Sequence, residues 1–185
     1  MTKTSKFTIS IVIGGILLIF VYFIFWTDIQ NAYYTRNAIF WNKDYQISYN
    51  DLVGDVNDNS KADMSIYMGL NLKSSFFNSV SVRAFLDKDK SWVSDTTKFE
   101  YDKEIELNQV RFNIYEAYSR KFNYEISEIE NLPGTTFENY EIIGEEIYSE
   151  INSIESEMFD SNISTSKAIE IWRPVADSLL NYYSD

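Results

Sequence analysis

The side chains of this chain that could perform acid–base or metal chemistry are mainly carboxylates. The 185 residues include 28 Asp and Glu but no histidine and no cysteine. Histidine is the usual general base near neutral pH and the commonest metal ligand, so Ser-His-Asp catalysis, Cys-His catalysis and histidine-ligated zinc sites are excluded. The lack of cysteine also excludes disulfides, thiolate metal sites and a lipidated cysteine anchor. Lysine, tyrosine, paired carboxylates and an all-oxygen metal site remain open.

Two groups of carboxylates have spacings that suggest a site. The fragment Asp55–Ser60 resembles the start of a calcium-binding loop, but Ser60 stands where glycine is required and Ile66 stands where the bidentate glutamate belongs. We therefore expect a solvated turn there. A second group of glutamates, between residues 138 and 157, recurs at helical spacing opposite apolar residues. Such a face could bind a basic partner, but a solvated helix face is the better interpretation.

The overall charge argues against a partner made of nucleic acid. Lys and Arg number 16, and the formal net charge is -12 at pH 7. A protein that binds nucleic acid needs a basic face to neutralise phosphates. The hydrophobic content of 45% is sufficient for a folded core, so a chain disordered throughout is not expected.

A long apolar segment near the N-terminus predicts a membrane anchor. Residues 7–26 contain no charged side chain, and fourteen of these twenty are Ile, Leu, Val or Phe. A helix of that length spans roughly 30 Å, the thickness of the hydrocarbon core of a bilayer. The alternative is a cleaved signal peptide. The segment is longer than the usual apolar region of such a peptide, and no small-residue cleavage site follows it.

The flanking charges predict the orientation of this anchor. Lys3 and Lys6 precede it, whereas the first basic residue after it is Arg36. The positive-inside rule places the N-terminus in the cytoplasm and the remainder outside, which in a bacterial inner membrane means the periplasm. The expected organisation is a cytoplasmic tail (1–6), a transmembrane anchor (7–26), a juxtamembrane segment rich in aromatic residues (27–43) and an exported domain (44–185).

The hydrophobic pattern of residues 44–185 predicts an α+β domain with a small antiparallel sheet followed by three helices. Alternation predicts strands over 45–49, 65–72 and 79–86, and a polar turn over 87–91. Capping boxes at Thr97–Glu100 and Thr135–Glu138 predict the starts of two helices. Apolar residues at steps of three and four predict the buried faces of the three helices, with a break or kink at Pro174. These residues are Leu107, Val110, Ile114, Ala117 and Tyr118; Tyr140, Ile143, Ile147, Ile151, Ile154 and Met158; and Ala168, Ile171, Trp172, Val175 and Leu179.

Several short motifs together resemble one known family. The motifs are Ile47–Gly54, Ala62–Leu70 with its Ser-Ile-x-x-Gly-Leu ending, Ser91–Val93, Arg111–Lys121, and Phe159-Asp160 followed by Trp172. They resemble a bacterial family of secreted zinc proteases with a zincin-like fold, the domain of unknown function nine-two-two. In that family a helix after the Ser-Trp-Val element carries a His-Glu-x-x-His motif that runs into Phe-Asp-Ile. The resemblance implies a zincin-like fold for residues 44–182.

The chain departs from this family at the residues that perform catalysis. Alignment of Phe112-Asn113-Ile114 with Phe-Asp-Ile places Leu107 and Arg111 at the two zinc-ligand positions and Asn108 at the catalytic glutamate. None of these three side chains can take over the role it replaces. The resemblance thus implies a pseudoenzyme with no metal and no cofactor. Arg111 either replaces the charge of the ion by pairing with a carboxylate, such as Glu116 or an acidic residue of the last helix, or it lies exposed on the helix surface.

Two classes of function follow from these observations. The first is a non-catalytic, single-pass membrane protein whose periplasmic domain is a scaffold or an accessory subunit of an envelope membrane-protein complex, with other envelope proteins as partners. A single-pass sensor leads to the same expectation, because six cytoplasmic residues cannot form a signalling domain. The second is an exported hydrolase that uses carboxylates only, as glycosidases do, although no pair of carboxylates stands out in the sequence.

Overall fold

The computed structural model describes residues 15, 22, 25–26, 28–57, 60, 62–74, 80–94 and 101–184. Its chain divides into two compact units, one made of Met1–Arg36 and Lys73–Val80, the other of Asn37–Leu72 and Ser81–Asp185. The predicted anchor over 7–26 lies outside the described residues except for four positions. A search confined to the described residues finds no helix with the length and hydropathy of a membrane span.

The described part of the first unit contains a short helix over residues 28–34. Its aromatic residues Tyr33 and Tyr34 are 63% and 72% exposed, and the guanidinium of Arg36 lies 5.0 Å from the Tyr33 ring. Asp28 forms an ion pair of 2.9 Å with Lys73, which belongs to the same unit. The aromatic side chains of this predicted juxtamembrane helix are therefore solvent-facing within their own unit.

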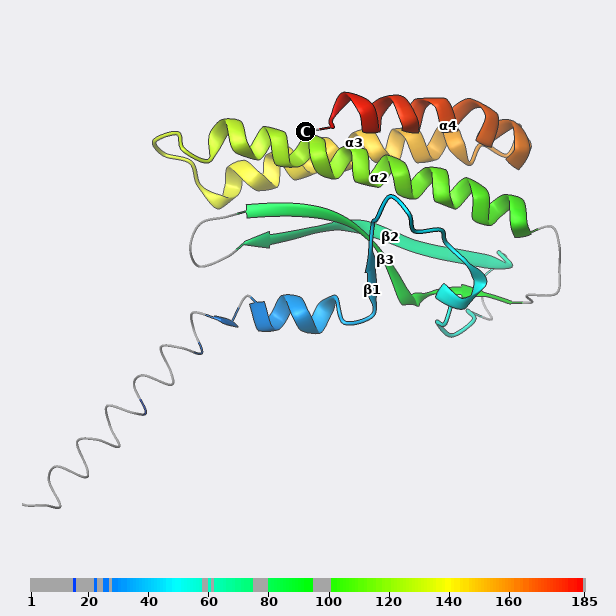
Figure 1. Ribbon diagram of the computed structural model, residues 1–185, viewed down its shortest axis with the longest axis horizontal. Coiled ribbons are helices and arrows are strands. Elements are labelled where there is room, and N and C mark those ends of the chain that lie inside the picture. The colour runs from blue at the N-terminus through cyan, green and yellow to red at the C-terminus, as the bar shows by residue number, and fades with distance from the viewer. Residues whose placement is uncertain are drawn as a thin grey trace, which may run out of the picture. The chain divides into compact units, whose positions relative to one another are not determined.

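The second unit is built on a three-stranded antiparallel sheet with strand order β1-β3-β2 (Figure 1). The strands are β1 (Ala38–Phe40), β2 (Met64–Ser74) and β3 (Val80–Val93). The central strand β3 pairs with β1 in the register Ala38 to Asp87, Ile39 to Leu86 and Phe40 to Phe85. Both long strands were predicted from their alternation. The pattern in β3 is visible in the buried side chains of Val82, Ala84 and Leu86.

The predictions of a strand at 45–49 and a turn at 87–91 are wrong. Residues 45–48 form no strand and lead instead into the short 3-10 helix η1 (Tyr49–Asp51). The backbone N–H of Ile47 donates to Oε1 of Gln109 (2.8 Å) rather than to a neighbouring strand. Residues 87–91 form no turn, since β3 continues through them to Val93. The buried hydroxyl of Ser91 accepts from the Tyr67 N–H (3.0 Å) and donates to the Asp87 carbonyl (2.7 Å). Because these bonds satisfy the hydroxyl, the polar stretch can remain in the sheet.

Three long helices form a layer on one face of this sheet, as Figure 1 shows. They are α2 (Tyr101–Ile129), α3 (Phe137–Met158) and α4 (Thr165–Tyr182). Helix α2 packs against both other helices and lies between the sheet and α4. Because α2 is covered on more than one side, it buries a second stripe besides the predicted one. That second stripe is Phe112, Tyr115, Phe122 and Ile126.

Of the two helix starts predicted from capping boxes, only that of α3 is described, and it is shifted by one residue. The predicted capping box at residues 97–100 lies outside the described residues. The box of α3 is formed by Thr136 and Asn139 rather than by Thr135 and Glu138. Helix α4 continues through Pro174, so the predicted break at this residue is absent. Its predicted buried face is shifted: Ala168, Ile169 and Ala176 are buried, whereas Ile171 and Val175 are exposed.

Candidate functional site

The three positions that the predicted resemblance aligns with a His-Glu-x-x-His motif, Leu107, Asn108 and Arg111, all lie on α2. Leu107 is buried, with 3% of its surface exposed, and belongs to the core. Asn108 is also buried and donates from Nδ2 to the carbonyl of Glu104, one turn earlier (2.8 Å). Its Oδ1 lies 3.4 Å from an Nη of Arg111. The helix thus brings Asn108 and Arg111 into contact, as their spacing of three residues predicts.

Arg111 is not an exposed surface residue. Only 16% of its side chain is exposed, and its Nε forms an ion pair with Oε1 of Glu155. An Nη group also donates to the carbonyl of Ile66 in β2 (2.8 Å). The predicted pairing with a carboxylate is therefore present, but the expected partners are wrong: Glu155 belongs to α3, and Glu116 pairs with Arg120 instead.

The Arg111 cluster, defined as Arg111, Asn108, Tyr115, Glu155 and the Ile66 carbonyl, ties β2, α2 and α3 together. The Tyr115 hydroxyl donates to the same carboxylate oxygen of Glu155 (3.0 Å). Burial raises the pKa of the Tyr115 phenol well above its usual range, so this hydroxyl remains a donor at neutral pH. Glu155 thus accepts two hydrogen bonds from α2. The prediction that the glutamates of this helix form a solvated face is therefore wrong for Glu155.

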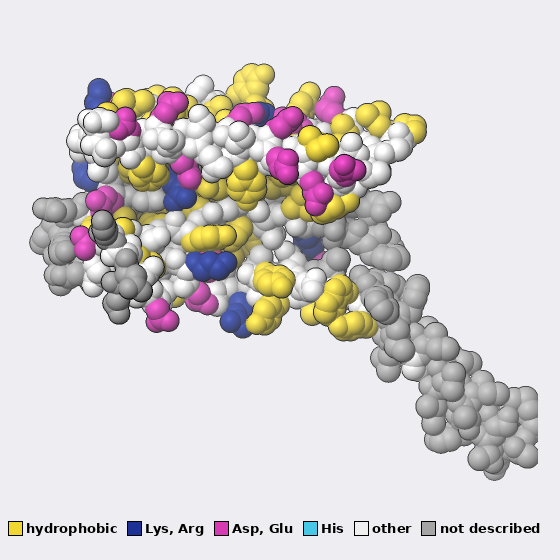
Figure 2. All heavy atoms as spheres, turned by 180° about the vertical axis from the view of Figure 1, so that it is seen from behind, with side chains coloured by type: hydrophobic (Ala, Val, Ile, Leu, Met, Phe, Trp, Pro, Cys, Tyr) yellow, Lys and Arg dark blue, Asp and Glu magenta, His cyan; other side chains and the backbone are white. Residues whose placement is uncertain are grey.

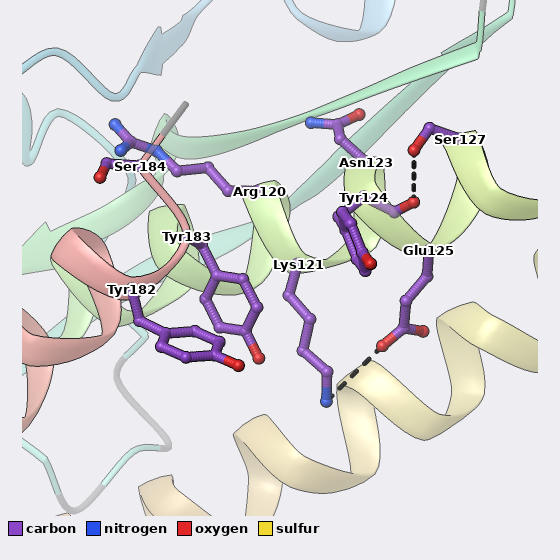
Figure 3. Close-up of a pocket in the computed structure, with 9 residues that line it drawn as sticks. All are labelled: Arg120, Lys121, Asn123, Tyr124, Glu125, Ser127, Tyr182, Tyr183 and Ser184. Atoms are coloured by element: carbon purple, nitrogen blue, oxygen red, sulfur yellow. Dashed lines mark hydrogen bonds and ion pairs between the residues drawn. The ribbon is translucent and has the colours of Figure 1, made fainter.

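A different part of α2, nearer its C-terminal end, lines two hollows in the domain. Two adjoining hollows of about 890 and 500 Å³ meet at three shared residues: Arg120, Asn123 and Ser184. We call their union the Arg120 groove. Figure 3 shows the larger hollow between the last turns of α2 and the end of α4. The remaining residues of the larger hollow are Lys121, Tyr124, Glu125, Ser127, Tyr182 and Tyr183; those of the smaller are Trp41, Val82, Arg83, Ala84, Glu116 and Ser119.

Arg120 is the cation shared by both hollows. Its Nε pairs with Oε1 of Glu116, one turn earlier on α2 (2.9 Å), and an Nη donates to the Leu180 carbonyl (3.4 Å). Its guanidinium carbon lies 5.3 Å from the centre of the Trp41 ring, a cation–π contact. The Trp41 indole N–H donates to Oδ1 of Asn113 (3.0 Å). The arginine is thus oriented, yet 29% of its side chain remains exposed to the groove.

Lys121 and the carboxylates around it provide the second charged group of the groove. Its Nζ lies 2.5 Å from Oε1 of Glu150 and 3.8 Å from Oε1 of Glu125. Although burial opposes it, these carboxylates raise the pKa of Lys121, so the amine is charged at neutral pH. Burial raises the pKa of Glu125, and the nearby Glu150 and Glu146 add to the effect, while Lys121 opposes it.

The groove combines cations, hydrogen-bonding groups and aromatic surfaces. The Tyr182 and Tyr183 rings lie edge to face, with their centres 4.9 Å apart, and Tyr182 is 79% exposed. On the face that Figure 2 shows, acidic side chains are present on the surface of the helical layer. In the part of the chain that the structure describes, no three acidic residues converge to hold a metal ion. The groove residues are therefore suited to binding a polar molecule.

Sequence reasoning did not find this groove. Its residues come from the segment after β1, from β3, from the part of α2 between Glu116 and Ser127 and from the end of α4 and the residues after it. The only local signal is the aromatic content of residues 40–41 and 182–183. Comparison of the chain with protein-family models, with curated proteins and with solved structures finds no match.

Proposed function

We propose that this chain is a non-catalytic domain, held at the bacterial inner membrane by residues 7–26, that binds other envelope proteins as a scaffold or accessory subunit. The observation that carries the proposal is the Arg120 groove, which combines an oriented arginine with exposed tyrosines. Arginine and the aromatic residues are the side chains enriched at the energetic centres of protein interfaces. The larger of its two hollows alone has a volume of about 890 Å³.

The contacts that occupy the Arg111 guanidinium support the non-catalytic part of this proposal. The resemblance to zincin-like proteases places Arg111 where that family holds a metal ligand, and here its Nε and one Nη are bound by Glu155 and the Ile66 carbonyl. A guanidinium paired in this way stabilises the packing of three elements but activates no water. We propose that the chain is a degenerate relative of that family in which an ion pair replaces the metal.

The experiment that tests the proposed function is the assembled mass of the full chain in mild detergent. We expect a complex of defined composition that is larger than the monomer in detergent. Tyr182→Ala should weaken it, because this exposed side chain lines the groove and contributes little to folding. Phe137→Ala is the matched control, since Phe137 is also an exposed aromatic (60%) but lies outside the groove. A monomer in several detergents would refute the scaffold function.

One observation favours the alternative hydrolase. Glu125 lies in the groove, burial raises its pKa, and Lys121 bridges it to Glu150. A carboxyl group with a raised pKa in a hollow is what a general acid requires. Turnover of chromogenic glycosides that is lost in Glu125→Gln but kept in Glu128→Gln, an exposed position, would support this activity. Absence of turnover by the native chain would exclude these substrates.

A further inference from the structure

The face of the sheet that points away from the helices carries a row of aromatic side chains. Along β3, side chains buried against the helices alternate with others on the opposite, outer face, which include Arg83 and Phe85. Phe40 of β1 is paired with Phe85, so the two rings share the outer face, with their centres 6.5 Å apart. The Tyr67 ring of β2 lies 6.4 Å from Phe85 and is 45% exposed. These three rings, which we call the aromatic row, cross all three strands.

A cation lies at each end of the aromatic row. The guanidinium carbon of Arg83 lies 4.1 Å from the centre of the Phe40 ring, and Nζ of Lys90 lies 4.5 Å from that of Tyr67. Lys90 also pairs with Asp87 (3.2 Å), although 58% of its side chain is exposed. Arg83 is exposed and makes no ion pair with a carboxylate among the residues that the structure describes. Aromatic rings beside basic side chains are typical of surfaces that contact lipid headgroups.

The charge of the domain is distributed unevenly between its two layers. The helices α2, α3 and α4 contain 15 acidic and 6 basic residues, whereas the three strands contain 2 acidic and 4 basic residues. The helical layer therefore has a formal charge of -9 and the strands one of +2. A bilayer with anionic lipids attracts the sheet side of the domain and repels the helical side.

The connections of the chain keep the sheet close to the predicted anchor. Residues 27–37 separate the anchor from β1, and 28–34 of these are helical. Seven helical and four extended residues span roughly 25 Å, which is less than the diameter of a domain of this size, about 35–40 Å. The further links between the two units also leave from strands, at Leu72–Lys73 in β2 and at Val80–Ser81 in β3.

We propose that the outer face of the sheet docks on the surface of the bilayer that holds residues 7–26. The aromatic row enters the headgroup region, and the guanidinium of Arg83 pairs with the phosphate of an anionic phospholipid. The helices, on the opposite face of the sheet, then point away from the bilayer (Figure 1). The larger hollow of the Arg120 groove, between α2 and α4, stays accessible to a protein partner in this orientation.

This inference rests on the membrane attachment in the proposed function, and the two can fail separately. The chain has no cysteine, so a single introduced cysteine can carry a fluorophore at a chosen position. Ser65→Cys places the probe at an exposed position of β2, on the same face as Tyr67 two residues later. Ser178→Cys is the matched control, at an exposed position of α4. Ile16→Cys reports on the predicted anchor itself.

The test is the quenching of these probes in the full chain, reconstituted in vesicles that contain phosphatidylglycerol. A lipid with a nitroxide on its headgroup should remove most of the fluorescence at Ser65→Cys and little at Ser178→Cys. A lipid with a nitroxide deep in its acyl chain should quench Ile16→Cys. Vesicles without phosphatidylglycerol should give weaker quenching at Ser65→Cys, because the attraction by anionic headgroups is lost.

Two pairs of variants make the test specific to the outer face. Arg83→Gln, with the probe at Ser65→Cys, should lower the ratio of docked to undocked chains roughly fivefold. Lys167→Gln removes the same charge from an exposed position of α4 and should have no effect. Tyr67→Ser should also reduce docking, whereas Tyr124→Ser, at an exposed tyrosine of α2, should not.

The outcomes separate docking from anchoring. Quenching at Ile16→Cys together with equal quenching at Ser65→Cys and Ser178→Cys would overturn docking and leave the anchor standing. Absence of quenching at Ile16→Cys would refute the anchor and docking with it. Quenching at Ser65→Cys that is unchanged by Arg83→Gln or by the removal of phosphatidylglycerol would overturn the proposal as well.

Discussion

Arg111 and Arg120 lie on the same helix, nine residues apart, and show two different uses of one residue type. Nine residues are about two and a half turns, so the two side chains leave α2 on opposite faces. Arg111 pairs across elements with Glu155, 44 residues away, and also holds a carbonyl of β2. Arg120 pairs within its own helix with Glu116, and its exposed side borders an open groove.

The two arginines differ in what they connect and, more modestly, in solvent access, since 16% of the Arg111 side chain is exposed against 29% for Arg120. In the Arg111 cluster the guanidinium and its partners fill the junction of three elements, so the positive charge stabilises the fold. At Arg120 the same group is oriented by a carboxylate and an indole ring while water and ligands can reach it. Arg111 thus joins three elements of the fold, whereas Arg120 is oriented but partly open to the groove.

The largest expected effect is a difference in the free energy of unfolding between variants of the two arginines. Arg111→Met should lower the free energy of unfolding by about 2–3 kcal/mol, because the Glu155 carboxylate and the Ile66 carbonyl each lose a donor. The melting temperature should fall by roughly 5–10 °C. Arg120→Met is the matched control. It should cost about 1 kcal/mol or less, because 29% of the Arg120 side chain is exposed and its partner Glu116 lies one turn away on the same helix. An unchanged melting temperature of Arg111→Met would refute the structural role of the Arg111–Glu155 pair.

A second experiment measures the coupling within each pair. A double-mutant cycle of Arg111→Met with Glu155→Gln should give a coupling energy of about 1–2 kcal/mol, since both groups lie mostly out of water. The same cycle for Arg120→Met with Glu116→Gln should give about 0.3–0.5 kcal/mol, as for other pairs four residues apart on a helix. Equal coupling energies, from chemical denaturation, would remove the distinction between the two regions.

The smallest expected effect concerns pH and the groove side of α2. Because the pKa of Glu125 is raised in the folded state, its protonated form is favoured by folding. Its contribution to stability is fully present below the unfolded pKa, near 4.5, and is lost as pH rises through the folded value. The stability of the native chain relative to Glu125→Gln should therefore fall between acidic and neutral pH. Glu128→Gln, at an exposed position on the same helix, is the control. A difference between native chain and Glu125→Gln that is independent of pH would contradict the raised pKa.

Much of the fold could be predicted because it depends on local patterns. The strand at 65–72 and the helix that buries Leu107, Val110 and Ile114 follow from periods of two and 3.6 residues. The two wrong predictions of strand and turn concern segments that bond to distant parts of the chain. At 45–49 the Ile47 N–H donates to Gln109, 62 residues away, instead of to a strand. At 87–91 the Ser91 hydroxyl accepts from the Tyr67 N–H, 24 residues away, within the sheet.

The candidate site was predictable only in part. The sequence marked Leu107, Asn108 and Arg111 as unsuited to metal chemistry, and the structure places all three on α2. It could not reveal the groove, because residues 41, 82–84, 116–127 and 182–184 are brought together by the packing of separate elements. The membrane anchor and the family resemblance stay predictions.

Residue types by themselves determined what this protein cannot do, since a chain without histidine or cysteine lacks whole classes of catalysis whatever its fold. Periodicity determined which residues share a face of a helix. Only the tertiary structure decided which neighbour each face meets: Glu155 rather than Glu116 for Arg111, and the backbone of Val82 for Asn123. The physical reason is that the period of a helix is set by its own backbone, whereas the side chain opposite is set by how distant elements pack.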